Sequence, residues 1–130
     1  MNGINEPKEP RKTIAPDKWE TFLREFADRN NNRRARFEVF RADGTIEEEG
    51  IEAHLEDVRL ETNDGNANNI VIIRIERGDK TAHKKHDTIT NVRGIGVQLD
   101  TDGSEDALEI TDDQNALISL RLESKVDGNS

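Results

Sequence analysis

The sequence predicts an α+β domain in which one N-terminal amphipathic helix packs on a mostly antiparallel sheet of about six to seven strands. Large apolar residues recur at helical spacing in only one segment, between Pro16 and Asp28. Short apolar runs with a period of two follow it, separated by Asp-Gly and Asn-rich turns. One run, Asn69–Glu76, holds five β-branched residues in six positions. We expect the strands to curl into a sandwich or an open barrel.

Length and composition favour a single soluble domain. The chain has 130 residues, of which 32% are hydrophobic and 36% charged, so the core must be small. We predict a globular domain over 13–123, a disordered arm over 1–12 and a frayed tail over 124–130. The sequence has no cysteine, no signal-peptide core and no apolar run near the roughly 20 residues of a membrane span. These absences predict a cytoplasmic protein with no membrane partner.

The net charge of −9 is unevenly distributed. Up to Arg41 the chain carries ten basic and seven acidic residues, and beyond it nine basic and 21 acidic residues. An acidic body repels phosphate backbones, so we expect no nucleic-acid partner. Solubility is the simplest reason for the acidity.

The predicted helix runs from Pro16 to about Asp28. Proline suits the first turn of a helix, and Asp17 and Glu20 place negative charge near its positive end. The stripe that must be buried consists of Trp19, Phe22, Leu23 and Phe26. We expect it to cover the sheet, although it could also be a face that docks a partner. The run Asn30-Asn31-Asn32 ends the helix.

Three strands are expected before the β-branched run. The first alternates Ala35, Phe37 and Val39 with charged residues, and Asp43-Gly44 then forms a turn. The second is irregular and runs from Ile46 to Leu55 past an acidic stretch, and the third covers Val58 to Thr62. A turn centred on Asp64-Gly65 leads into Asn69–Glu76, which we predict to be a central strand with both faces covered. Arg74 marks its side or end nearer water.

The remaining chain alternates between strands and turns. The polar segment Lys80 to His86 fits either an edge strand or a loop. Ile95, Val97 and Leu99 form a clean alternation, and Leu108 and Ile110 form a short strand after the turn over 100–106. In the last strand, Ile118 to Leu122, Ser119 and Arg121 face outward.

Several motifs together resemble a known family. They are Trp19-x-x-Phe22-x-x-x-Phe26, Arg36-Phe37-Glu38-Val39, Ala107-Leu108-Glu109-Ile110-Thr111-Asp112 and Leu117-Ile118-Ser119-Leu120-Arg121-Leu122. In this order they are similar to a family of small bacterial, often cyanobacterial, proteins of unknown function. The similarity spans about Thr13 to Leu122. It implies a small single domain and no particular activity.

Two segments carry residue types that bind metal ions. In a calcium-loop register, Asp100, Asp102, Gly103 and Glu109 fall at positions 3, 5, 6 and 12. Gln98 replaces the aspartate of position 1, and an Asp-Gly hairpin turn explains the same residues. His83 and His86, with Asp87, could bind zinc or nickel if the segment is a turn or a helix. On a strand the two imidazoles point to opposite faces.

The only basic cluster of the sequence is Arg29, Arg33, Arg34 and Arg36. Arg34 and Arg36 share one face of a strand, so a solvated charged face is the default interpretation. The alternative is a surface that binds an anion or an acidic partner.

We predict a non-enzymatic protein that needs no cofactor and binds a protein partner or a second copy of itself. The contact would use a sheet edge or the groove between helix and sheet. The chain has no cysteine, no tyrosine and no serine with a histidine in a recognisable catalytic pattern. The alternative is a calcium- or metal-responsive module that uses the loop from Asp100 to Glu109 or the pair His83 and His86.

Overall fold

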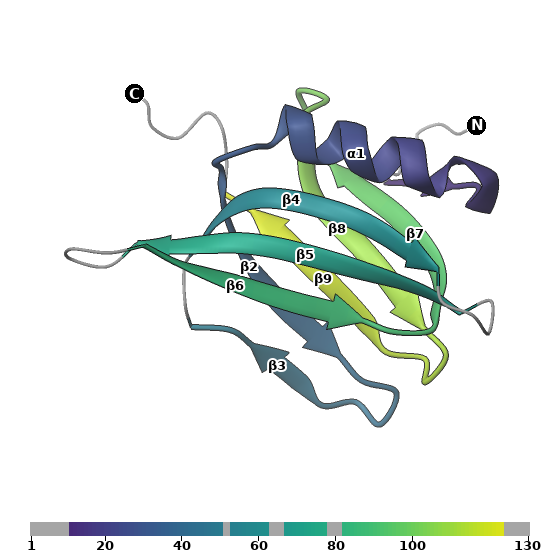
Figure 1. Ribbon diagram of the computed structural model, residues 1–130. Helices are drawn as coiled ribbons and strands as arrows, with labels where there is room; N and C mark the ends of the chain where they lie inside the picture. The colour runs from purple at the N-terminus through teal and green to yellow at the C-terminus, as the bar shows by residue number, and fades with distance from the viewer. Residues whose placement is uncertain (1–10, 51–52, 63–66, 78–81, 124–130) are drawn as a thin grey trace, which may run out of the picture.

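The computed structural model describes residues 11–50, 53–62, 67–77 and 82–123, which form an α+β domain (Figure 1). The predicted tail, the turn around Asp64-Gly65 and most of the predicted arm lie outside the described residues. The first strand begins at Arg11, two residues inside the range assigned to the arm. The elements in chain order are β1 (Arg11–Ile14), the 3-10 turn η2 (Pro16–Lys18), α1 (Trp19–Arg29), β2 (Arg34–Phe40), β3 (Ile46–Glu48), β4 (Ala53–Thr62), β5 (Asn68–Arg77), β6 (Ala82–Ile89), β7 (Val92–Leu99), β8 (Glu105–Asp112) and β9 (Leu117–Leu122).

The described strands form one antiparallel sheet. Its order is β1-β7-β8-β9-β2-β4-β5-β6, and β3 pairs with β2 beside this path. The nine strands exceed the six or seven expected from the sequence. One reason is that β1 is too polar to show a period-two pattern and is defined by its pairing with β7. The sheet remains open and continuous, so it is not a sandwich of two separate sheets.

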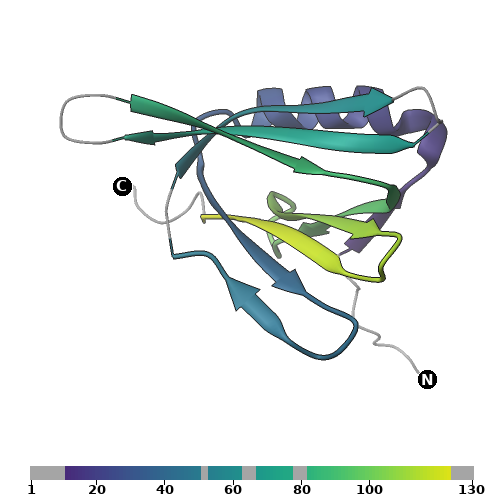
Figure 2. The same cartoon turned by 60° about the horizontal axis from the view of Figure 1, so that its bottom comes forward.

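The sheet divides at β2. One edge of this strand pairs with β4 at Arg34 and Ala35, and the same edge pairs with β3 from Glu38 to Phe40. Beyond this fork the sheet curls, so that β4, β5 and β6 lie over the layer that contains β2, β9, β8 and β7 (Figures 1 and 2). The turn predicted at Asp43-Gly44 joins β2 to β3, and Gly44 has a φ of +93° that suits glycine. The predicted strand from Ile46 to Leu55 is therefore two strands.

Strand β4 unites two predicted strands. Ala53 to Leu55 and Val58 to Thr62 form one strand that pairs with β5, and the register shifts between Leu55 and Asp57. This irregularity places Glu56 out of step with the alternation, which explains why the sequence pattern breaks there.

The core lies between the two layers and is covered by α1. The helix residues Trp19, Leu23 and Phe26 are buried, and Phe22 is half-buried, as the stripe predicts. Each fully buried side chain of this size stabilises the fold by roughly 1.5–3 kcal/mol. The indole N–H of Trp19 donates to the carbonyl of Ile14 at 2.9 Å and so joins the helix to β1. From the sheet the core takes Leu55, Val58, Ile70, Ile72, Val92, Ile95, Val97, Leu108, Ile110, Ile118, Leu120 and Leu122.

Strand β5 confirms one prediction and corrects another. Residues Ile70 to Ile73 are buried on both faces, as expected, although β5 lies next to the edge strand β6. Arg74 was expected near water, but its side chain has an exposed fraction of 0%. Its place in the strand puts it on the same face as Ile70 and Ile72, because alternate residues share a face. A buried guanidinium needs partners, and Arg74 has several.

Most partners of Arg74 lie at the fork of β2, and one, Asp87, lies on β6. Its Nη1 and Nη2 atoms donate to the two carboxylate oxygens of Glu49 at 2.7 and 2.9 Å. Nη1 also donates to the Ala35 carbonyl at 3.0 Å, and Nη2 reaches Asp87 at 3.3 Å. The guanidinium carbon lies 4.5 Å from the centre of the Phe37 ring.

Candidate anion-binding site

The four arginines predicted as one basic patch divide into two pairs. Arg29 binds the carboxylate of Glu105 through two hydrogen bonds of 3.0 and 2.6 Å. Arg33 donates to the Asn30 side chain and to the backbone carbonyls of Glu105 and Glu123. Burial lowers the pKa of Arg33. These two side chains hold the end of α1 to the sheet; the Arg29 contact is exposed, whereas the hydrogen bonds of Arg33 are partly buried.

Arg34 and Arg36 face outward from β2, as the alternation predicts, and both are exposed. In the ladder between β2 and β9, Arg36 lies directly opposite Arg121. Two like charges at directly opposed positions destabilise a sheet. Ser119 and Arg121 were both predicted to face outward; the Arg121 side chain is 38% exposed, but Ser119 is buried, at 2%. The place of Arg121 beside Arg36 depends on a strand pairing that spans 85 residues and has no local signal.

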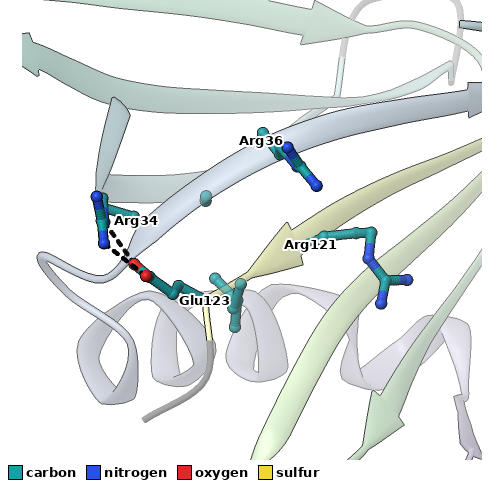
Figure 3. Close-up of a pocket in the computed structure, with 6 residues that line it drawn as sticks. Arg34, Arg36, Arg121 and Glu123 are labelled. Carbon is teal, nitrogen blue, oxygen red and sulfur yellow. Dashed lines mark hydrogen bonds and ion pairs between the residues drawn. The ribbon is translucent and has the colours of Figure 1, made fainter. Parts of the chain in front are cut away.

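The three arginines line a surface pocket of about 230 Å³ at the end of the β2–β9 ladder (Figure 3). Its described lining is Arg34, Ala35, Arg36, Arg121, Leu122 and Glu123. The lining therefore carries three cationic groups and one carboxylate. Arginine stays protonated at every physiological pH, so the three guanidiniums of this lining can bind an anion. We call Arg34, Arg36 and Arg121 the arginine face.

The three guanidiniums differ in how they are paired. Arg34 forms a two-armed ion pair with Glu123. Arg121 lies 3.9 Å from Glu38 and 3.7 Å from Asp106, which is too far for hydrogen bonds. Within the described part of the chain, Arg36 has no carboxylate within ion-pair distance. The arginine face thus has unused capacity to donate hydrogen bonds to an anion.

The residues of the calcium hypothesis are in two separate places. Asp100 and Asp102 lie in the β7–β8 turn, where their carboxylates accept hydrogen bonds from the backbone of Thr101 and of Ser104. Glu109 lies in the middle of β8, and its carboxylate is 3.2 Å from Arg11. The structure therefore does not bring the three carboxylates together.

His83 and His86 both lie in the edge strand β6. They are three residues apart and so point to opposite faces of the sheet, which is the arrangement that does not suit a shared ion. Among the described residues there is no group of three or more histidine, aspartate or glutamate side chains placed to hold a metal. Metal binding stays an untested hypothesis without a favourable geometry.

The groove between helix and sheet, the other surface proposed for binding, is also present. It has a volume of about 420 Å³ and lies between α1 and the β1–β7 edge. Its charged groups include Arg29 and Glu105, which neutralise each other. The described lining is Lys12, Ile14, Phe22, Arg29, Asn30, Val97, Leu99, Gly103, Ser104 and Glu105. It offers less unpaired charge to a ligand than the arginine face does.

No protein-family model matches the chain, and neither a curated protein nor a solved structure shows significant similarity to it. The resemblance to small bacterial proteins therefore remains a prediction. Function has to be argued from the site alone.

Proposed function

We propose that this protein is a small, non-enzymatic binding domain that takes an acidic segment of a partner protein on its arginine face. The observation that carries the proposal is the directly opposed pair Arg36 and Arg121 in the β2–β9 ladder, where Arg36 is exposed and the Arg121 side chain is 38% exposed. An anion between the two guanidiniums converts a repulsive contact into an attractive one. A ligand carboxylate is favoured because arginine binds carboxylates through paired hydrogen bonds.

The spacing of the arginine face suits an extended acidic segment. Arg34 and Arg36 are two residues apart on one strand face, which separates their Cα atoms by about 7 Å. Alternate residues of an extended ligand repeat at the same distance. A segment with acidic residues at every second position can therefore present two carboxylates on one side, and this spacing defines the preferred ligand.

Other partner classes fit this surface less well. The net charge of −9 opposes every acidic ligand at low salt, and most of all nucleic acid and a second copy of the chain, because these carry more negative charge than a short acidic segment. Ile46, which is 59% exposed, is the one strongly exposed large hydrophobic side chain of the described residues. A scattered apolar residue does not make an oligomer interface. No described helix is long and apolar enough to cross a bilayer.

The proposal can be tested with a fluorescein-labelled peptide of alternating glutamate and serine, followed by fluorescence anisotropy in 0.15 M salt. Charges more than about 8 Å apart are largely screened there, so the general repulsion by the acidic body is reduced. Arg36→Glu and Arg121→Glu should each weaken binding at least tenfold, since one charge-assisted contact is worth roughly 1.5–3 kcal/mol. A peptide with its glutamates in one block should bind less tightly.

Arg93→Glu is the matched control. Arg93 is exposed on β7, away from the arginine face, and the substitution changes the net charge by the same amount. It should bind the alternating peptide like the wild type. Equal losses of affinity in all three variants would show that binding depends only on the net charge of the protein, and the proposal would then be wrong. Light scattering of the free protein tests self-association directly.

A further inference from the structure

Glu123 places a carboxylate inside the proposed site. It follows the last residue of β9, and its side chain points to Arg34 in the pocket (Figure 3). The Nε and Nη2 atoms of Arg34 donate to the two carboxylate oxygens, the second at 2.5 Å. This side-by-side geometry is the one that arginine adopts with an aspartate or glutamate of a binding partner.

The backbone of Glu123 is fixed independently of its carboxylate. Its N–H donates to the Arg34 carbonyl at 2.9 Å, and its own carbonyl accepts a hydrogen bond from Arg33. The side chain can therefore leave Arg34 while the main chain stays in place. Both side chains are well exposed, at 45% for Arg34 and 38% for Glu123, so water can replace the pairing at little cost.

We infer that Glu123 is an internal competitor that occupies the position of one ligand carboxylate and is displaced when an acidic segment binds. This inference rests on the proposed function, and it adds that the wild-type site is partly self-inhibited. Arg36 and Arg121 receive the first ligand carboxylate, because neither has a hydrogen-bonded acidic partner among the described residues. A second carboxylate, two positions along the ligand, then exchanges with Glu123 on Arg34.

The size of the inhibition follows from the exposure of the pair. Exposed ion pairs are worth up to about 1 kcal/mol, which corresponds to about a fivefold change in a dissociation constant. Glu123→Gln should therefore bind the alternating peptide about two- to fivefold more tightly than the wild type. Glutamine keeps the length of the side chain and one acceptor oxygen, and the backbone hydrogen bonds of residue 123 do not involve the side chain, so the end of β9 is preserved.

A double-mutant cycle separates competition from a general loss of negative charge. The four proteins are the wild type, Glu123→Gln, Arg34→Gln and the double variant, all titrated with the same peptide. If Glu123 competes for Arg34, its replacement strengthens binding in the Arg34 background and has no effect once Arg34 is glutamine. If it acts only through its charge, the gain is the same in both backgrounds, and the inference is overturned.

The failure of the inference can be told apart from the failure of the proposed function. If the wild type binds and Glu123→Gln binds no more tightly, only the competitor role is lost. If no protein of the cycle binds the peptide, both proposals fall. A second measurement is the Nε–H resonance of Arg34 in the wild type, which should shift on saturation with peptide while the backbone amide of Glu123 stays hydrogen-bonded. An unmoved Arg34 resonance in a saturated complex contradicts displacement.

Discussion

Glu49 completes the edge of β2 at the fork of the sheet, and Arg74 holds it there from the opposite layer. The Glu49 N–H donates to the Phe37 carbonyl at 2.9 Å, and its carboxylate accepts the Phe37 N–H at 3.0 Å. Glu49 thus supplies both the donor and the acceptor for Phe37 that the backbone of a neighbouring strand would otherwise provide. Arg74 then neutralises the carboxylate through two hydrogen bonds. Glu49, held by Arg74, therefore takes the place of a pairing strand at Phe37, between the part of β2 that pairs with β4 and the part that pairs with β3.

Arg74→Met should lower the free energy of unfolding by about 3 kcal/mol. The substitution leaves the half-buried carboxylate of Glu49 without its main partner, and uncompensated charges of this kind cost roughly 3–5 kcal/mol. We expect the lower end, because 19% of the Glu49 side chain reaches water. Urea denaturation followed by tryptophan fluorescence measures the change, since Trp19 is the only tryptophan.

Two further variants test the origin of this loss. Arg59→Met, on the exposed face of β4, removes the same group from a surface position and should cost less than about 0.5 kcal/mol. Glu49→Leu combined with Arg74→Met removes both charges and should be less destabilised than Arg74→Met alone. A double variant that is much less stable than the single one would show that the backbone contact at Phe37, not charge, dominates.

The stability of the protein should fall as the pH drops below about 5. Burial by itself raises the pKa of Glu49, but the hydrogen bonds from Arg74 and the Phe37 N–H outweigh it, and the pKa is lowered overall. The same balance, with Arg29 and Asn30 as donors, lowers the pKa of Glu105. A carboxyl whose pKa is lower in the folded state stabilises the fold above its unfolded pKa of about 4.3. That contribution is lost as the pH falls through the folded pKa.

Glu49→Gln and Glu105→Gln identify the groups responsible. Each removes one titrating carboxylate, so each variant should be less stable than the wild type at pH 7 and should lose less stability between pH 5 and pH 3. Urea midpoints at four or five pH values are sufficient. Parallel pH curves for the wild type and both variants would mean that other carboxylates cause the acid sensitivity.

Local patterns predicted the elements of this fold better than its connections. The helical stripe and the Asp43-Gly44 turn depend on neighbouring residues only, and both are confirmed. The burial of Arg74 was missed because its partner Glu49 is 25 residues away and meets it only after the sheet curls. The alternation with Ile70 and Ile72 was a usable signal, because it already put Arg74 on the core face.

The candidate site shows the same limit. The outward direction of Arg34, Arg36 and Arg121 follows from alternation within each strand. That Arg36 and Arg121 face each other follows from the pairing of β2 with β9, two strands that are far apart in the sequence. Arg29 and Arg33 were grouped with them by sequence distance alone. Their side chains instead lie near the end of α1, where Arg29 binds the carboxylate of Glu105 and Arg33 binds its backbone carbonyl.

Arg36→Glu should make the protein more stable while it weakens binding of the acidic peptide at least tenfold. The substitution turns a repulsive cross-strand pair into an attractive one with Arg121, and such pairs contribute roughly 0.2–1 kcal/mol. For a domain of this size, that change raises the melting temperature by about 1–4 °C. The gain should shrink between 0.05 and 0.5 M sodium chloride, because salt screens exposed charges. Differential scanning calorimetry of the wild type, Arg36→Glu and the control Arg93→Glu provides the comparison.

Two opposed arginines lower the stability of the sheet, so stability alone does not explain why they are placed there. A binding surface commonly loses some stability because its residues are arranged for the ligand. An Arg36→Glu protein that melts at or below the wild-type temperature contradicts this view of the pair.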